Sequence, residues 1–177
     1  ATIENRGLIH ALAGLAIGNG GRTLLCTEGD LRVDAPSVLN IFDGALELGG
    51  NTGLLGTGTL AFNGTMTVNA DSDITLPATL SVSPAGIVTF NGPGTVTNLS
   101  VMTLSNDVIN AEFTNGGTIV AHTTNSINGP FFNDVGGTLS VDGTGPDSFL
   151  SIAAGFSNAG EINLFGGGGW RTRLTVS

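Results

Sequence analysis

Two pairs of carboxylates are the residues of this chain best suited to acid–base chemistry. Asp71 and Asp73, and likewise Glu28 and Asp30, stand two positions apart, so each pair would share one face of an extended strand. Two carboxyl groups roughly 5 to 9 Å apart across a glycosidic bond can perform glycoside hydrolysis. Both pairs have turn-like neighbours, however, and Asp is common in turns because its side chain bonds its own backbone. We therefore expect solvated turn carboxylates, not catalytic pairs.

The possible metal ligands are few and scattered along the chain. His10 and His122 lie far apart without a zinc-binding spacing, and the single Cys26 adds no second thiol. Asp142 and Asp147 flank a loop that could offer oxygens to calcium, but the loop lacks the EF-hand pattern. The sequence therefore predicts no metal and no cofactor. We expect Cys26 to be a buried, unreactive thiol.

Two further patterns have ordinary structural explanations. The glycine-rich residues 166–170 are not followed by Lys or by a helical pattern, so we expect a loop and not a phosphate cradle. Thr-x-Thr pairs that begin at Thr57, Thr65 and Thr95 would suit an ice-binding array. These pairs recur at no constant interval, and outward-facing Thr is common in strands. Neither pattern indicates a site.

Charge is scarce and mostly negative. The 177 residues include 14 acidic and 5 basic side chains, which gives a formal net charge of -9. No Lys or Arg lies between Arg32 and Arg171, so this span cannot neutralise the phosphates of nucleic acid or of an anionic bilayer. It also lacks the basic side chain with which a polysaccharide lyase abstracts a proton. We expect no nucleic-acid partner and, without a long apolar run, no membrane insertion in this segment.

Short runs of alternating apolar and polar residues predict β-strands, for example at residues 65–68, 87–90 and 138–141. Alternation with a period of two places the apolar side chains on the inner face and Thr or Ser on the outer face. Turn dipeptides such as Asn63-Gly64 and Asp142-Gly143 separate the runs. No convincing amphipathic helix competes, so we predict an all-β chain.

A degenerate repeat runs through the chain: an apolar residue, Asn two positions later, Gly four later and a β-branched residue six later. The copies that match fully are Ile3, Asn5, Gly7 and Ile9; Phe113, Asn115, Gly117 and Ile119; and Phe156, Asn158, Gly160 and Ile162. Looser copies begin at Phe62, Phe90 and Phe132, which implies an irregular period near two dozen residues. In a coil, such residues would stack about 4.8 Å apart, with the apolar members inside and the Asn side chains bonded along the axis.

The repeat, together with residues 56–64, resembles the right-handed parallel β-helix repeats of bacterial surface proteins, such as autotransporter passengers and filamentous-haemagglutinin-like proteins. The resemblance implies an exported protein with a structural or adhesive role. We therefore predict one domain over residues 1–177, folded as a right-handed parallel β-helix of about eight irregular rungs. An antiparallel β-sandwich is the alternative fold, because short strands with tight turns could also build one.

The expected function is that of an extracellular structural or adhesive surface protein and not of an enzyme. A carbohydrate-active β-helix enzyme, glycosidase-like or lyase-like, is the alternative. The sequence begins inside a copy of the repeat and ends inside a strand-like run, and an open β-helix end invites pairing. We therefore expect a segment of a longer assembly or a subunit that stacks end to end into a filament. The expected partners are copies of itself and a host or environmental glycan or surface receptor.

Overall fold

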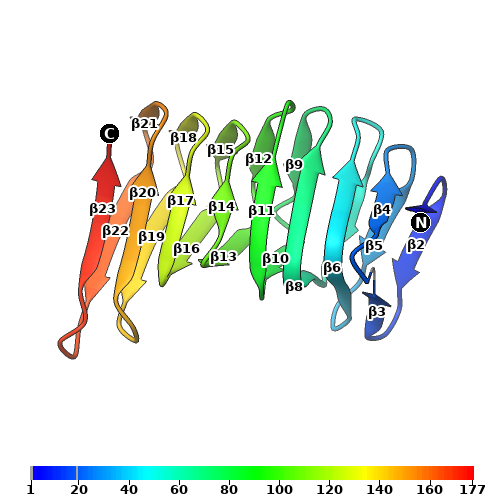
Figure 1. Ribbon diagram of the computed structural model, residues 1–177, viewed down its shortest axis with the longest axis horizontal. Helices are drawn as coiled ribbons and strands as arrows, with labels where there is room; N and C mark the ends of the chain where they lie inside the picture. The colour runs from blue at the N-terminus through cyan, green and yellow to red at the C-terminus, as the bar shows by residue number, and fades with distance from the viewer. Residues whose placement is uncertain (1, 19) are drawn as a thin grey trace.

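The structure is a computed structural model that describes residues 2–18 and 20–177. Within these residues the chain forms strands and no helix, and every strand pair is parallel. The strands wind into a solenoid of about eight turns, with the first coil at one end of the long axis and the last at the other (Figure 1). The predicted all-β solenoid is therefore confirmed, and the antiparallel sandwich is wrong.

Each full coil contributes one strand to each of three faces. The first face holds β1 (Thr2–Glu4), β4 (Thr23–Cys26), the second half of β6 (Val38–Leu48), the second half of β8 (Thr59–Ala70), β11 (Ile87–Asn91), β14 (Val108–Ile109), β17 (Thr124–Ile127), β20 (Ser148–Ile152) and β23 (Thr172–Val176). The long strands β6 and β8 bend at a corner and continue from the third face onto the first.

The second and third faces complete each coil. The second face holds β2 (Leu8–Ala11), β5 (Asp30–Val33) and β7 (Leu54–Gly56), and then, as a separate sheet, β9 (Ile74–Leu76), β12 (Val96–Asn98), β15 (Phe113–Asn115), β18 (Phe131–Asn133) and β21 (Phe156–Asn158). The third face holds β3 (Leu15–Gly18), the first halves of β6 and β8, β10 (Ser81–Pro84), β13 (Val101–Ser105), β16 (Thr118–His122), β19 (Thr138–Gly143) and β22 (Glu161–Gly166).

The core is a column of apolar side chains that runs along the axis. On the first face, Leu24, Leu46, Val68 and Phe90 occupy matching positions in successive coils and are all buried. Side chains that bond from coil to coil are 17 to 25 residues apart in sequence, so coil length varies. The parallel ladder tolerates this variation because the extra residues lie in the turns.

The register of the phenylalanines shows that the looser copies of the repeat are not equivalent to the full copies. Phe113, Phe131 and Phe156 lie in register on the second face, whereas Phe132 pairs with outward positions and is 37% exposed. Phe62 lies on the third face and Phe90 on the first. The predicted equivalence of Phe62, Phe90 and Phe132 with Phe113 and Phe156 is therefore wrong. All three faces share the same alternation, so a local pattern does not reveal the face to which it belongs.

Candidate functional site

A buried asparagine ladder runs along the corner between the second and third faces. The side-chain amide of Asn98 donates to Asn115 Oδ1 at 2.8 Å, Asn115 donates to Asn133 at 2.8 Å, and Asn133 donates to Asn158 at 2.7 Å. The amide of Asn115 also donates to the backbone carbonyl of Thr138 at 3.1 Å. Because the first three amides are buried, these bonds satisfy polar groups that would otherwise be costly to remove from water.

The three full copies of the repeat fall at two different corners. Those that begin at Phe113 and Phe156 turn from the second face to the third, and their Asn residues belong to the inner ladder. Their glycines, Gly117 and Gly160, are packed so closely that an added Cβ would lie 2.3 Å and 2.2 Å from backbone oxygens of the neighbouring coil. The larger side chain of any other residue would force these coils apart.

The copy that begins at Ile3 instead turns from the first face to the second. Ile3 is paired with Leu24 on the first face, and Ile9 with Leu31 on the second. The Asn5 amide donates to the Asp30 carbonyl at 3.1 Å, and its Oδ1 accepts the Gly7 backbone N–H at 3.2 Å. This copy therefore caps a different corner and does not continue the inner ladder.

A second, outer ladder follows the ends of the strands on the first face, and the repeat did not reveal it. The Asn69 amide donates to Glu47 Oε1 at 2.7 Å, Asn91 to Asn69 at 3.0 Å, Asn110 to Asn91 at 2.9 Å and Asn128 to Asn110 at 2.8 Å. Each Asn directly follows an inward apolar residue at a strand end, and this spacing is a signal that sequence inspection could have used. All donors in this ladder point the same way, toward the carboxylate.

Three of the four predicted carboxylates lie in turns, and the fourth, Asp30, begins β5. One member of each pair accepts a backbone N–H group. Asp73 Oδ1 accepts the Thr95 backbone N–H at 2.9 Å, and Asp30 Oδ1 accepts that of Gly53 at 2.8 Å. Asp71 is exposed in the turn before β9, and the Glu28 carboxylate is 4.0 Å from Arg6 Nε. The contacts of Asp73, Asp30 and Glu28 connect neighbouring coils.

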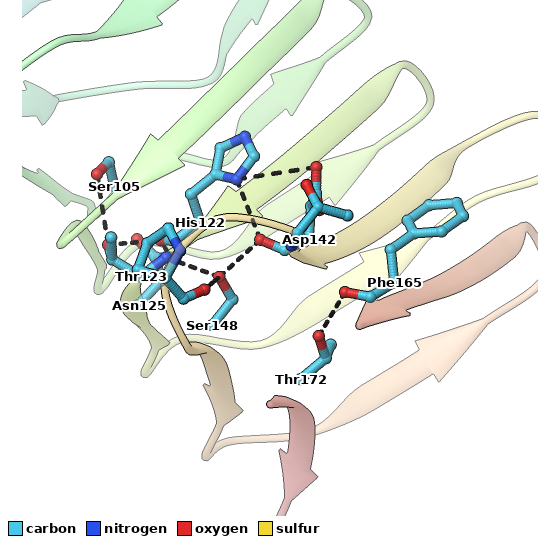
Figure 2. A network of polar contacts seen from close by, with 10 residues as sticks. Ser105, His122, Thr123, Asn125, Asp142, Ser148, Phe165 and Thr172 are labelled. Carbon is cyan, nitrogen blue, oxygen red and sulfur yellow. Dashed lines mark hydrogen bonds and ion pairs between the residues drawn. The ribbon is translucent and has the colours of Figure 1, made fainter. Parts of the chain in front are cut away.

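A serine, a histidine and an aspartate meet at the corner that leads out of β16 and β19, shown in Figure 2. Ser148 Oγ donates to the backbone carbonyl of Asp142 at 2.6 Å, and His122 Nδ1 is 3.1 Å from that same oxygen. The Asp142 carboxylate is 4.0 Å from Nδ1, and the Thr144 backbone N–H holds the pKa of this carboxyl below its usual value.

This corner lacks the geometry of a nucleophilic triad. Such a triad needs the hydroxyl bonded to the imidazole that removes its proton. Here the hydroxyl of Ser148 donates to a carbonyl, accepts the Thr123 backbone N–H at 3.0 Å and is fully buried. The three side chains therefore hold two coils together.

The residues considered as metal ligands lie apart. His10 Nε2 is 2.8 Å from Asp34 Oδ2, and Arg32 Nε is 3.1 Å from the same oxygen. Asp147 accepts the Arg171 backbone N–H at 2.7 Å and lies 3.4 Å from its Nε. Over residues 2–18 and 20–177, no three His, Cys, Asp or Glu side chains form a cluster that could hold a metal ion.

The surroundings of Cys26 and Asp34 shift the pKa of each group in the direction that burial and hydrogen bonding predict. Cys26 is buried in the core, and burial raises the pKa of its thiol, although the Asn5 amide opposes this shift. Hydrogen bonds from Arg32 and His10 lower the pKa of Asp34. A thiol held protonated inside the core is unreactive, as the sequence predicted for Cys26.

Asp107 is a buried carboxylate that the sequence analysis missed. One of its oxygens accepts the Val88 backbone N–H and the other that of Ser105, each at 2.7 Å. Its own backbone N–H donates to Asn125 Oδ1 at 2.9 Å. The side chain is 1% exposed, and burial raises its pKa from 3.8 to about 6, although both backbone bonds lower it. Asp107 thus joins three successive coils, because its carboxylate bonds the preceding coil and its backbone N–H bonds the following one.

Replacing Asp107 with Asn is expected to change how stability depends on pH. A carboxyl whose pKa is 3.8 unfolded and about 6 folded binds more protons in the folded state, so its contribution falls as pH rises through that window. Urea unfolding at several pH values should show a difference of up to about 1.4 kcal/mol per pH unit between wild type and the variant, confined to this window. Parallel curves for the two proteins would show that Asp107 is not the titrating group.

Two further findings concern the chain as a whole. In the part that the structure describes, no helix is long and apolar enough to cross a membrane. Comparison of the chain with models of protein families, with curated proteins and with solved structures finds no match. The coiled fold and the contacts described above are therefore the basis for any proposal about function.

Proposed function

We propose that this chain is a structural or adhesive segment of an extracellular surface protein, of the kind that bacteria export. The observation that carries the proposal is the use of polar side chains for cohesion along the axis. Two asparagine ladders, the turn carboxylates and Ser148 all bond to neighbouring coils or turns. A rod whose coils are linked in this way resists local opening, because each coil is held by both its neighbours.

The same contacts favour this role over a carbohydrate-active enzyme. Catalysis by a glycosidase needs two carboxyl groups that face a shared substrate. Asp73 and Asp30 instead accept backbone N–H groups, and Asp107 is enclosed between coils. The scarcity of basic side chains likewise favours partners other than nucleic acid, since contacts to phosphate groups rely on Lys and Arg.

The proposal includes stacking against further coils. Phe156, Ile162 and Leu174 occupy inward positions in the last coils but are only partly buried. At the other end, Ile9, Leu15 and Ile17 are partly buried in the same way. Another β-coil placed on either end would continue the sheets and cover these side chains, which favours end-to-end association.

Immunogold electron microscopy of intact cells from the producing organism tests the proposal. With an antibody raised against the purified chain, we expect gold on the outside of unpermeabilised cells, along fibres if the coils stack. Labelling that appears only after permeabilisation would overturn the surface role. Release of reducing sugar from polysaccharides by the purified chain, lost on Asp71→Asn with Asp73→Asn, would favour the enzyme instead.

A further inference from the structure

An open groove of about 540 Å³ follows the corner between the third and first faces. It crosses the bend of β8, the end of β10, the start of β11 and the end of β13, and thus extends over several coils. Its lining includes Gly64, Thr65, Pro84, Ile87, Ser105 and Asn106. The volume is within the range of about 300–1,000 Å³ that is usual for ligand sites.

The backbone at this corner brings the coils that line the groove close together. Gly64 has a φ of 75°, which favours glycine, and an added Cβ on Gly86 would lie 2.0 Å from the Gly64 carbonyl oxygen. Asn106 also adopts a left-handed conformation, with φ 64°. The two glycines therefore let successive coils pack closely along this corner. A non-glycine residue with positive φ is itself a reason to look for function.

The chemistry of the lining is polar but uncharged. Thr65 and Asn106 are exposed and offer a hydroxyl and an amide. The half-buried Ser105 adds a second hydroxyl, which donates to Thr123 Oγ1 at 3.3 Å and can still accept a hydrogen bond. Ile87, which is 52% exposed, supplies an apolar surface beside them. Hydroxyls and amides next to a small apolar surface match a sugar ring, which has hydroxyl edges and a face of C–H groups.

The nearest charges are negative. Asp43 Oδ1 accepts the Thr65 backbone N–H at 3.1 Å at one end of the groove. Asp107 lies beneath the other end and accepts the Ser105 backbone N–H. No Lys or Arg is among the residues that line the groove, and Arg22 lies one coil beyond Asp43, beside Gly44. Carboxylates or sulfates of an acidic glycan would therefore be repelled.

We infer that this groove binds a segment of a neutral glycan, with Thr65, Ser105 and Asn106 bonding its hydroxyls and Ile87 contacting a ring face. The inference rests on the proposed surface role and narrows it to an adhesive one. The groove runs across successive coils, so a glycan chain that follows the corner could engage several of them.

Calorimetric titration of the purified chain tests this inference with cellohexaose, chitohexaose and mannohexaose as neutral probes and oligogalacturonate as the acidic probe. We expect binding to at least one neutral hexasaccharide and none to oligogalacturonate. Thr65→Val, Ile87→Asp and Asn106→Gly should each weaken that binding about tenfold or more, since each removes one contact worth about a factor of ten. The Asn106→Gly change keeps the left-handed backbone and removes only the amide side chain.

Matched changes outside the groove provide the controls. Val101→Asp alters a 57% exposed apolar residue at the far end of β13, and Thr67→Val removes a hydroxyl from β8; both should bind like wild type. Circular dichroism identifies any variant that fails to fold, and the remaining groove variants then decide. The inference is overturned if no neutral probe binds, if oligogalacturonate binds better, or if the groove and control variants behave alike. Surface labelling without glycan binding would leave the structural role in place, so the two failures are distinguishable.

Discussion

Replacing Phe131 with Ala is expected to lower the free energy of unfolding by about 3–5 kcal/mol, as for other fully buried phenylalanines. Phe131 is 0% exposed and lies between two rings of the same column. Its ring centroid is 6.2 Å from that of Phe113 and 5.8 Å from that of Phe156, with which it stacks at an interplanar angle of 4°. Alanine would leave a cavity that the hydrogen-bonded coils on either side cannot close.

The adjacent residue provides the control for this prediction. Phe132 has the same side chain on the same short strand, but it points outward and is 37% exposed. We expect Phe132→Ala to cost less than about 1 kcal/mol. Urea unfolding of both variants, followed by circular dichroism, measures the difference. Equal losses, or a larger loss for Phe132→Ala, would contradict the register in which Phe131 stacks.

Replacing Asn115 with Asp is expected to destabilise the fold by about 3 kcal/mol or more at pH 7, because it places an unpaired charge in the core. The Asn115 amide donates to Asn133 Oδ1 and to the Thr138 carbonyl. An ionised carboxylate has no hydrogen to donate and would face both oxygens at hydrogen-bond distance. Of the contacts made by Asn115, it could retain only the bond accepted from Asn98.

The outer ladder supplies a matched Asn→Asp control. Asn128 is exposed at the end of that ladder, and its amide makes one side-chain bond, to Asn110 at 2.8 Å. Asn128→Asp should cost less than about 1 kcal/mol, because water can solvate the new charge. Thermal and urea unfolding at pH 7 compare the two variants. Similar losses at Asn115 and Asn128 would show that the inner ladder contributes no more than an exposed one.

The two ladders and the phenylalanine column together account for the cohesion of the coils along the axis. The inner contacts are apolar rings and fully bonded amides, and the outer contacts are amides that remain accessible to water. Many polar side chains of the coil bond to neighbouring coils, whereas Thr65 and Asn106 in the groove beside Gly64 are exposed. The substitutions that test glycan binding therefore lie in this groove.

The local pattern of the sequence determined the class of fold and the direction of most side chains. The alternation at residues 65–68, 87–90 and 138–141 predicted strands, and these runs lie in β8, β11 and β19. Asn115 and Asn158 were expected to bond along the axis, and they do so through Asn133. The strands and turns depend on neighbouring residues alone, because a strand alternates with a period of two and a tight turn requires particular residues. The Asn bonds also require the coils to stack in register.

Only the tertiary structure decided which residues of different coils meet. The packing of the coils placed Phe131, and not Phe132, in the phenylalanine column. It also enclosed Asp107 between coils, linked Glu47 to a ladder of four asparagines and formed the groove beside Gly64. Partners in these contacts are 17 to 25 residues apart, and the turns between them differ in length. Shifting a coil by one residue reverses every side chain between inside and outside, so the register is set by the packing of whole coils and not by any local pattern.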